Sequence, residues 1–265
     1  IHVLRCFEND NIVHVDGSVD PIRDKETIDI ELQLKDLETV EKRLEKVTRA
    51  AKAGDKKAAK EMDLLNRVKE ALLTGVSARA VQISDEEKEL MDSFQLLTTK
   101  PVLYVCNVDE KSAKNGNAYV EKVKEVVKNE DAEVIVLAVA TEADITELES
   151  YEERQMFLED IGLEEPGASK LIRAAYHLLN LQTYFTAGVK EVRAWTIHKG
   201  DTAPQAAGVI HTDFEKGFIR AEVIAYDDFI TYGSEAKVKE AGKMRVEGKE
   251  YIVKDGDIMH FRFNV

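Results

Sequence analysis

The sequence is poor in the residues that cross-link a chain or anchor it in a membrane. It has two cysteines and four prolines in 265 residues, and its longest apolar runs are only strand-sized. Such runs are too short to cross a bilayer, so we expect a soluble cytoplasmic protein without a membrane partner. Both cysteines, Cys6 and Cys106, lie in apolar, strand-like stretches. Two buried thiols in a reducing compartment are therefore expected, with a single disulfide as the alternative.

Positive charge is also in short supply. Lysine and arginine number 37 against 51 aspartates and glutamates, which gives a net charge of -14. Because phosphate repels an acidic surface, this balance argues against broad attraction to nucleic acid, and no DNA partner is expected. A local basic patch could still dock on RNA. At 265 residues and 44% hydrophobic, the chain is long enough for two or three units with substantial cores.

The first residues of the sequence have the pattern of a β-strand. His2 to Phe7 are mostly apolar, and a core strand needs a partner to pair with, so we expect residues upstream of Ile1 that this sequence does not include. Turn signals follow at Asp16-Gly17 and Asp20-Pro21.

From Thr27, apolar residues recur every three or four positions up to Val47, which predicts a helix. Gly54-Asp55 breaks the pattern, and a second helical run continues to Leu72. Two such helices joined by a short polar break predict an antiparallel hairpin. Its outer faces are basic and are read either as solvated surface or as a docking face; these residues are Arg43, Lys46, Arg49, Lys52, Lys56, Lys57 and Lys60.

The middle of the chain has the pattern of an α/β domain. Ser84-Asp85-Glu86-Glu87 has the form of a capping box and predicts a helix through Leu97. The apolar run 101–106 predicts a buried parallel strand, followed by a helix at 119–127 and a second strand at 134–139. Residues 142–180 look mainly helical. After Leu181, short alternating strands and turns predict a separate small α+β module.

The most informative segment is Asn107-Val108-Asp109-Glu110, which directly follows the buried strand. Ligands of open parallel sheets bind at the carboxyl ends of strands. Regulatory GTPases carry Asn-Lys-x-Asp there, and its Asp pairs with guanine N1-H and the 2-amino group. Here Val108 replaces the lysine and Glu110 the aspartate, which predicts weaker guanine preference and acceptance of ATP. An Asn at a strand end is also commonly a cap or turn former, so this reading has a structural alternative.

The next strand ends at Ala138-Val139-Ala140, where the same GTPases carry a small-residue loop whose backbone N–H groups close over the base. Together these features resemble the YchF group of Obg-like ATPases. Further segments carry the resemblance: Arg5-Cys6-Phe7-Glu8, Val19-Asp20-Pro21, Leu181 to Gly188, Val192 to Thr196, His211 to Phe218 and Asp255 to Val265.

The resemblance implies a Ras-like nucleotide domain at 1–24 and 99–180, an inserted helical hairpin at 25–98 and a TGS domain of β-grasp fold at 181–265. It also implies ATP with Mg²⁺ as cofactors, GTP as a weaker ligand, slow hydrolysis, and the ribosome as partner, through rRNA or ribosomal protein, in translation or stress regulation. Carried onto this sequence, the base-side residues are Asn107, Val108, Glu110, Ala138, Val139 and Ala140.

The sequence contains no G-x-x-x-x-G-K-[ST] phosphate loop. The family's phosphate loop, Mg²⁺-binding Ser/Thr and switch segments would precede Ile1, so we expect no catalytic residue and no metal ligand in this chain and no ATP hydrolysis by it alone. A strict GTPase of the same fold and a nonenzymatic ribosome-binding adaptor are the alternatives.

The remaining chemical groups are expected to be structural. His211 with Asp213 lacks a nucleophile at any recognisable spacing, and the other histidines are scattered without metal-ligand spacing. Trp195, Tyr184 and Phe185 are expected in a small core, although stacking on RNA bases is the alternative.

Overall fold

The computed structural model describes residues 1–130, 132–188 and 191–264. The chain divides into two compact units, Ile1–Ala174 and Ala175–Val265, and each is described by itself. No helix among the described residues is long and apolar enough to span a membrane. The finer division predicted at residues 24, 98 and 180 stays a prediction.

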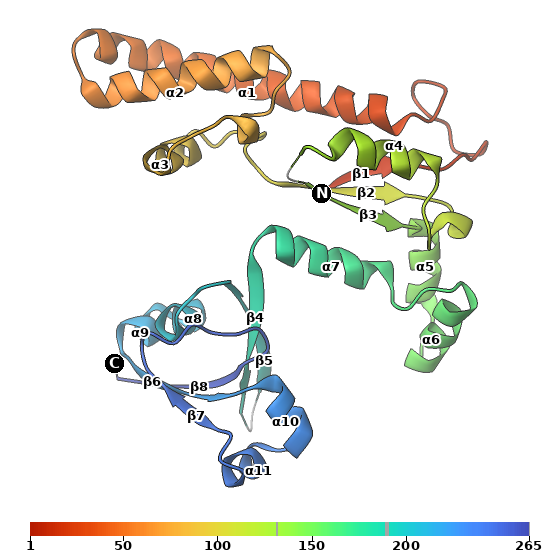
Figure 1. The fold of residues 1–265 in the computed structure, drawn as a ribbon, viewed down its shortest axis with the longest axis vertical. Coiled ribbons are helices and arrows are strands. Elements are labelled where there is room, and N and C mark those ends of the chain that lie inside the picture. The colour runs from red at the N-terminus through yellow and green to blue at the C-terminus, as the bar shows by residue number, and fades with distance from the viewer. Residues whose placement is uncertain (131, 189–190, 265) are drawn as a thin grey trace. The chain divides into compact units, whose positions relative to one another are not determined.

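A three-stranded parallel sheet forms the centre of the first unit (Figure 1). Its strands are β1 (His2–Arg5), β2 (Val102–Asn107) and β3 (Ala132–Leu137), in the order β1-β2-β3. Helix α4 (Ala118–Val127) connects β2 to β3 and packs its valines against the sheet. The predicted strand–helix–strand unit is confirmed. Strand β3 ends at Leu137 and not at Val139 as predicted, because a helix begins at Val139.

The helical hairpin consists of α1 (Pro21–Lys52) and α2 (Lys56–Leu73), as the apolar spacing predicted. Figure 1 shows α2 folding back along the distal part of α1. The turn between them contains Gly54, whose positive φ of +92° favours glycine over other residues, and Asp55 caps α2. Helix α1 begins well before Thr27, because the Asp20 carboxylate accepts hydrogen bonds from the N–H groups of Ile22 and Arg23. Its first turns face the sheet and lack a repeating apolar stripe.

The hairpin encloses its own core, in which Val40, Leu64, Leu65 and Val68 are fully buried. A short 3-10 turn, η1 (Ala78–Ala80), and α3 (Asp85–Ser93) follow α2. The Ser84 capping box is confirmed, but α3 ends at Ser93 and does not continue through Leu97.

The early end of α3 has a tertiary cause. The buried Asp36 carboxylate of α1 accepts hydrogen bonds from the N–H groups of Leu97 and Thr98, both at 2.7 Å, and holds this segment in a non-helical path. Gln95 accordingly adopts a positive φ of 55°.

After β3 the chain is helical, as predicted, through α5 (Val139–Glu147), α6 (Tyr151–Asp160) and α7 (Gly167–Leu178). Gly162, with a φ of +71°, interrupts the path between α6 and α7.

The second unit is a mixed five-stranded sheet in the order β5-β4-β8-β6-β7. Its strands are β4 (Leu181–Ala187), β5 (Val192–His198), β6 (Phe218–Ile224), β7 (Arg245–Glu247) and β8 (Ile258–Phe263). Its helices are α8 (Ala203–Ile210), α9 (Thr212–Lys216), α10 (Tyr226–Tyr232) and α11 (Glu235–Glu240). The predicted α+β character is confirmed.

The three aromatic residues predicted to lie in the core of this unit are buried to different extents. Tyr184 is fully buried and donates its hydroxyl hydrogen to Ala206 O at 2.9 Å. Trp195 and Phe185 are half-buried, and the Arg193 guanidinium lies 4.1 Å from the Trp195 ring centroid. His211 has a structural role, because its Nδ1 accepts from the Asp213 N–H at the start of α9.

Candidate functional site

The carboxyl ends of the three parallel strands lie at one edge of the sheet, where hydrogen bonds join them. Cys6 N donates to Asn107 O at 2.7 Å, and Val108 N donates to Leu137 O at 2.8 Å. Residues beyond each strand end are therefore fixed relative to their neighbours, as a ligand-binding edge requires.

Asn107 joins the two segments that the sequence singled out. Its Oδ1 accepts a hydrogen bond from the N–H of Val139 at 3.1 Å, although the two residues are far apart in the chain. Helix α5 starts at Val139, and its N-cap position holds Ala138, which has no side-chain acceptor. Asn107 thus supplies the missing cap from the neighbouring strand. Its Nδ2 has no hydrogen-bond partner among the described residues.

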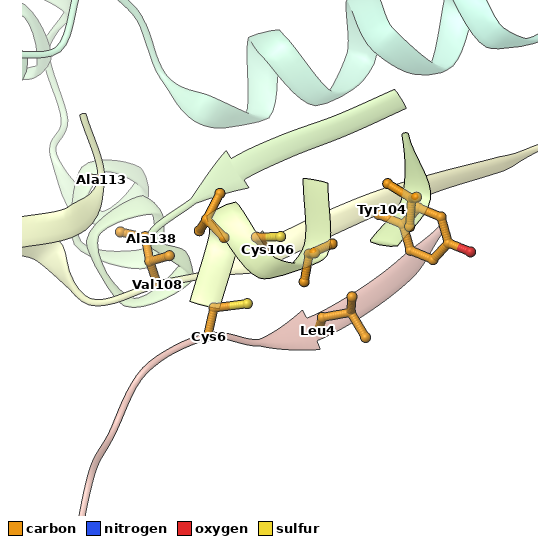
Figure 2. Close-up of a cluster of buried hydrophobic side chains, with 10 residues drawn as sticks. Leu4, Cys6, Tyr104, Cys106, Val108, Ala113 and Ala138 are labelled. Atoms are coloured by element: carbon orange, nitrogen blue, oxygen red, sulfur yellow. The ribbon is translucent and has the colours of Figure 1, made fainter. Parts of the chain in front are cut away.

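Val108 points away from this edge. Its side chain is 3% exposed and packs in the core of the first unit. Figure 2 shows Val108, Ala113 and Ala138 grouped at one end of this core, near Cys6 and Cys106. Val108 therefore positions Asn107 and Asp109 on either side of it, and its side chain offers no surface to a ligand.

The two carboxylates that follow Val108 are exposed and differ in their surroundings. Asp109 caps the short 3-10 helix η2 (Glu110–Ser112), since its Oδ1 accepts from Ser112 N at 3.0 Å. Glu110 is exposed at the start of η2 and has no ion-pair partner among the described residues. Among the residues that the structure describes, the Glu110 carboxylate has no partner on either oxygen, whereas Asp109 has Oδ1 engaged and Oδ2 open.

The predicted small-residue loop is the first turn of α5. Ala138 is buried, whereas Val139 is 45% exposed and Ala140 is exposed. A helix start presents unpaired N–H groups and the positive end of the helix dipole. The segment is therefore a helix N-terminus and not an irregular loop; its Val139 N–H is already bonded to Asn107 Oδ1, and the predicted role of Ala138, Val139 and Ala140 beside a base stays a prediction.

Two further residues hold this edge together, and sequence reasoning missed both. Asn117 caps α4 through its Oδ1 and donates from Nδ2 to Cys6 O at 2.7 Å, which fixes the end of β1. An Asn directly before a helical pattern was the available signal.

Glu142 of α5 is the second residue. Its carboxylate accepts hydrogen bonds from the N–H groups of Gly167 at 2.7 Å and Ala168 at 3.1 Å, and so caps α7. Gly167 leaves no room for a side chain, because an added Cβ would lie 1.9 Å from Leu137 Cδ2. No local sequence pattern indicates this contact.

The two cysteines are free and buried, as expected. The hydrogen bond to Cys106, together with burial, raises the pKa of the Cys6 thiol well above its usual range. Both sulfurs belong to the packed core beneath the edge (Figure 2).

A charged cluster lies near the amino-terminal ends of β2 and β3, on the side of the sheet opposite the strand ends described above. The Lys25 Nζ, almost fully buried, contacts Asp29 Oδ2 at 2.7 Å and Glu130 Oε1 at 2.8 Å. Tyr104 donates its hydroxyl hydrogen to Glu130 Oε2 at 2.9 Å, and Arg79 lies 3.4 Å from the same oxygen. This cluster joins the base of the hairpin to the sheet.

The pKa values in this cluster follow from that geometry. Burial opposes the charge on Glu130, but the hydrogen bonds from Lys25 and Tyr104 outweigh burial and hold the Glu130 pKa below its ordinary value. Burial raises the pKa of Tyr104 to about 12. Burial also disfavours the Lys25 charge, yet the Asp29 and Glu130 carboxylates raise the Lys25 pKa overall.

The fold also brings together His14, Asp16 and Asp24, whose ligand atoms lie within 4.8 Å of one another. The sequence spacing did not indicate this cluster. Arg23 lies 3.3 Å from Asp16 and 3.1 Å from Asp24, and His14 Nε2 lies 2.9 Å from Asp24. The single Arg23 guanidinium thus pairs with both carboxylates.

Comparison with known proteins agrees with this architecture. Residues 181–264 match the family YchF-GTPase_C, described as "Protein of unknown function (DUF933)". The Ribosome-binding ATPase YchF of Haemophilus ducreyi is 54% identical over 264 residues, which cover 100% of this chain and 72% of that protein. The protein of the same name from Bacillus subtilis is 54% identical over 266 residues, with the same coverage.

More distant relatives extend the likeness. The rat Obg-like ATPase 1 is 48% identical over 271 residues, which cover 99% of this chain and 67% of that protein. The solved structure of the Schizosaccharomyces pombe YchF GTPase superposes with a TM-score of 0.84 at 39% identity, over 98% of this chain and 71% of that one. The chain belongs to the YchF family of Obg-like ATPases.

Proposed function

We propose that the protein is an ATP-preferring nucleotide hydrolase of the YchF type that associates with ribosomes in the cytoplasm and binds GTP more weakly. Family membership supports the reaction class. The observation that carries the nucleotide assignment is the hydrogen bond from Val139 N–H to Asn107 Oδ1, which brings the two base-side segments to one edge of the sheet.

Adenine suits the donors and acceptors of this edge. The Asn107 Nδ2 is free to donate to adenine N7, and the exposed first turn of α5 closes the other side of the base. Guanine needs a carboxylate placed to accept from N1-H and the 2-amino group. Glu110 is one methylene longer than the aspartate that serves this purpose, so the guanine-specific pair is weakened. Val108 contributes only by packing.

Phosphates and Mg²⁺ are held by a phosphate loop in nucleotide hydrolases of this class, and no such motif occurs in these 265 residues. We therefore propose that no residue among 1–265 is a Mg²⁺ ligand and that this chain alone does not hydrolyse ATP. Bound Mg²⁺ would neutralise charge on the β- and γ-phosphates. The role of Asn107, Glu110 and the α5 turn is to orient the purine.

We assign the ribosome contact to the tip of the hairpin. Five basic side chains are exposed there and have no carboxylate partner among the described residues: Lys46, Arg49, Lys52, Lys56 and Lys57. The other two members of the predicted basic set are engaged, Arg43 with Glu61 at 2.5 Å and Lys60 with Glu86 at 3.8 Å. A compact basic tip on a chain with a net charge of -14 suits rRNA phosphates.

Turnover by the full-length protein tests the nucleotide assignment. Asn107→Ala removes both the α5 cap and the base contact, so we expect the KM for ATP to rise about tenfold or more. Asn66→Ala, on an exposed position of α2, is the matched control and should leave the KM unchanged. Equal KM values for all three proteins, or turnover of GTP alone, would reject the assignment.

Cosedimentation with ribosomes tests the hairpin tip. Reversal of Arg49 and Lys52 to glutamate should release the protein at lower salt than wild type, because each lost phosphate contact weakens binding. Reversal of the paired Arg43 is not a clean control, so Lys88 of α3, which pairs with Asp85, serves instead. Unchanged cosedimentation of the tip variant would move the contact to another surface.

A further inference from the structure

Helix α1 carries its charges in two separate blocks. The half next to the sheet, residues 21–41, has seven carboxylates and three cations, Arg23, Lys25 and Lys35. The half next to the tip, residues 42–52, has five cations and one carboxylate. Four of the seven carboxylates form ion pairs and Asp36 is buried. Glu26 and Glu31 are the exposed acidic side chains of this half that have no partner among the described residues.

An apolar groove lies in the acidic half, where α2 ends beside α1. Four large aliphatic side chains are exposed there: Ile30 by 55%, Leu34 by 57%, Leu73 by 62% and Val76 by 42%. Ile30 and Leu34 are one turn apart on the same face of α1. With Leu37 and Leu72 they line a hollow of about 230 Å³.

This hollow continues into a larger cleft of about 810 Å³, since Ile30, Gln33 and Gly75 line both. We call the two together the hairpin groove. Its lining comes from the first unit alone. Contiguous exposed aliphatic side chains of this size commonly mark a contact surface.

The charges that remain free around the hairpin groove are negative. The two cations of the cleft are already neutralised, Lys25 by Asp29 and Glu130, and Arg79 by Glu130. Glu26 stands one turn before Ile30, and Glu70 stands one turn before Leu73. Both are exposed, and neither has an ion-pair partner among the residues that the structure describes.

We propose that the hairpin groove binds a cationic amphipathic helix of a partner protein. A partner helix with aliphatic residues three and four positions apart would pack against Ile30, Leu34, Leu73 and Val76. Its lysines or arginines would lie beside Glu26 and Glu70. An anionic helix or RNA would meet the same carboxylates and be repelled. This inference does not depend on the nucleotide assignment.

Fluorescence anisotropy with two synthetic peptides tests the groove on the full-length protein. The probe is a fluorescein-labelled 18-residue Leu/Lys amphipathic helix, and the matched probe carries Glu in place of Lys. We expect saturable binding of the Leu/Lys peptide and none of the Leu/Glu peptide. The double variant Leu34→Ser, Leu73→Ser should weaken binding by about tenfold or more, because two large apolar contacts are lost.

Leu32→Ser is the matched control, because Leu32 is 37% exposed on a different face of α1; it should change affinity less than about twofold. The pair Glu26→Gln, Glu70→Gln keeps the aliphatic surface and should weaken binding and reduce its salt dependence. This second variant gives an answer even if the leucine variant folds poorly.

Three results would overturn the proposal. These are the absence of saturable Leu/Lys binding, equal binding of both peptides, and affinity unaffected by either groove variant. Sedimentation equilibrium adds a fourth: a wild-type dimer that the Leu34 and Leu73 changes dissociate would identify a second copy of the chain as the occupant.

Discussion

Replacement of Lys25 by methionine probes the connection between the hairpin and the sheet. Methionine keeps the length and the apolar stem of lysine but removes the charge that holds Asp29 and Glu130. The two carboxylates would then lie beside the Tyr104 ring, whose centroid is 5.4 Å from the Lys25 Nζ, with Arg79 as the remaining cation.

The magnitude follows from the burial of the three groups. Removal of one partner from a fully buried ion pair costs about 3–5 kcal/mol. The side chain of Lys25 is only 6% exposed, but Asp29 and Glu130 are 22% and 25% exposed and would regain some hydration. We therefore expect a loss of about 2–3 kcal/mol in the free energy of unfolding of the first unit. In urea this corresponds to a midpoint shift of about 1 M.

The chain provides its own controls for the measurement. Lys35 pairs with Glu38 at 3.2 Å on the same helix, but both side chains are more than half exposed, so Lys35→Met should cost under about 0.5 kcal/mol. The single tryptophan, Trp195, lies in the second unit and reports that unit separately. Far-ultraviolet circular dichroism in urea should shift for Lys25→Met while the Trp195 fluorescence midpoint does not. Equal destabilisation by Lys25→Met and Lys35→Met would refute the reasoning.

Three further predictions concern the same unit. Gly167→Ala should destabilise it by about 1–3 kcal/mol because the new Cβ meets Leu137, whereas Gly248→Ala, in open space, should be neutral; thermal unfolding compares them. Glu142→Ala should speed hydrogen exchange at the amide of Gly167 by about tenfold, with slower exchange restored in part by Glu142→Gln, and unchanged exchange would contradict the capping role. The Glu130 pKa is lowered in the folded state, so its contribution to stability is complete above the ordinary value of 4.5 and is lost as the pH falls through the lower folded value; Glu130→Gln should remove this part of the acid unfolding profile, measured as urea midpoint against pH.

The sequence was informative wherever a regular repeat extended over several turns. The apolar spacing from Ile30 to Val47 and the break at Gly54 predicted the hairpin, and the runs before Asn107 and Ala138 predicted parallel strands. The proximity of those two strand ends was also predictable, since carboxyl ends of neighbouring parallel strands meet at one edge.

The missed features are tertiary. Asp36 ends α3 from a position on α1, and Glu142 caps α7 across 25 residues, so neither contact has a local pattern. Val108 lies in the core, a burial that depends on the path of the chain after β2. The predicted roles of Asn107, Val108 and Glu110 toward a purine remain predictions.

The hairpin carries an exposed basic tip at one end and, at the other, an apolar groove flanked by Glu26 and Glu70. The partners that we propose for them differ accordingly, RNA for the tip and a cationic helix for the groove. The Lys25 cluster fixes the base of α1 to the sheet whose opposite edge holds Asn107. Variants of Lys25 therefore test the stability of this connection separately from the nucleotide site that we propose at the Asn107 edge.

The proposed adenine preference is tested by a calorimetric titration of the full-length protein with ATP and with GTP, in wild type and in Glu110→Asp. We expect tighter binding of ATP by the wild type and a shift toward GTP in Glu110→Asp, because the shorter carboxylate is better placed for guanine N1-H and the 2-amino group. Tenfold tighter binding of GTP than of ATP by the wild type would contradict the proposed preference.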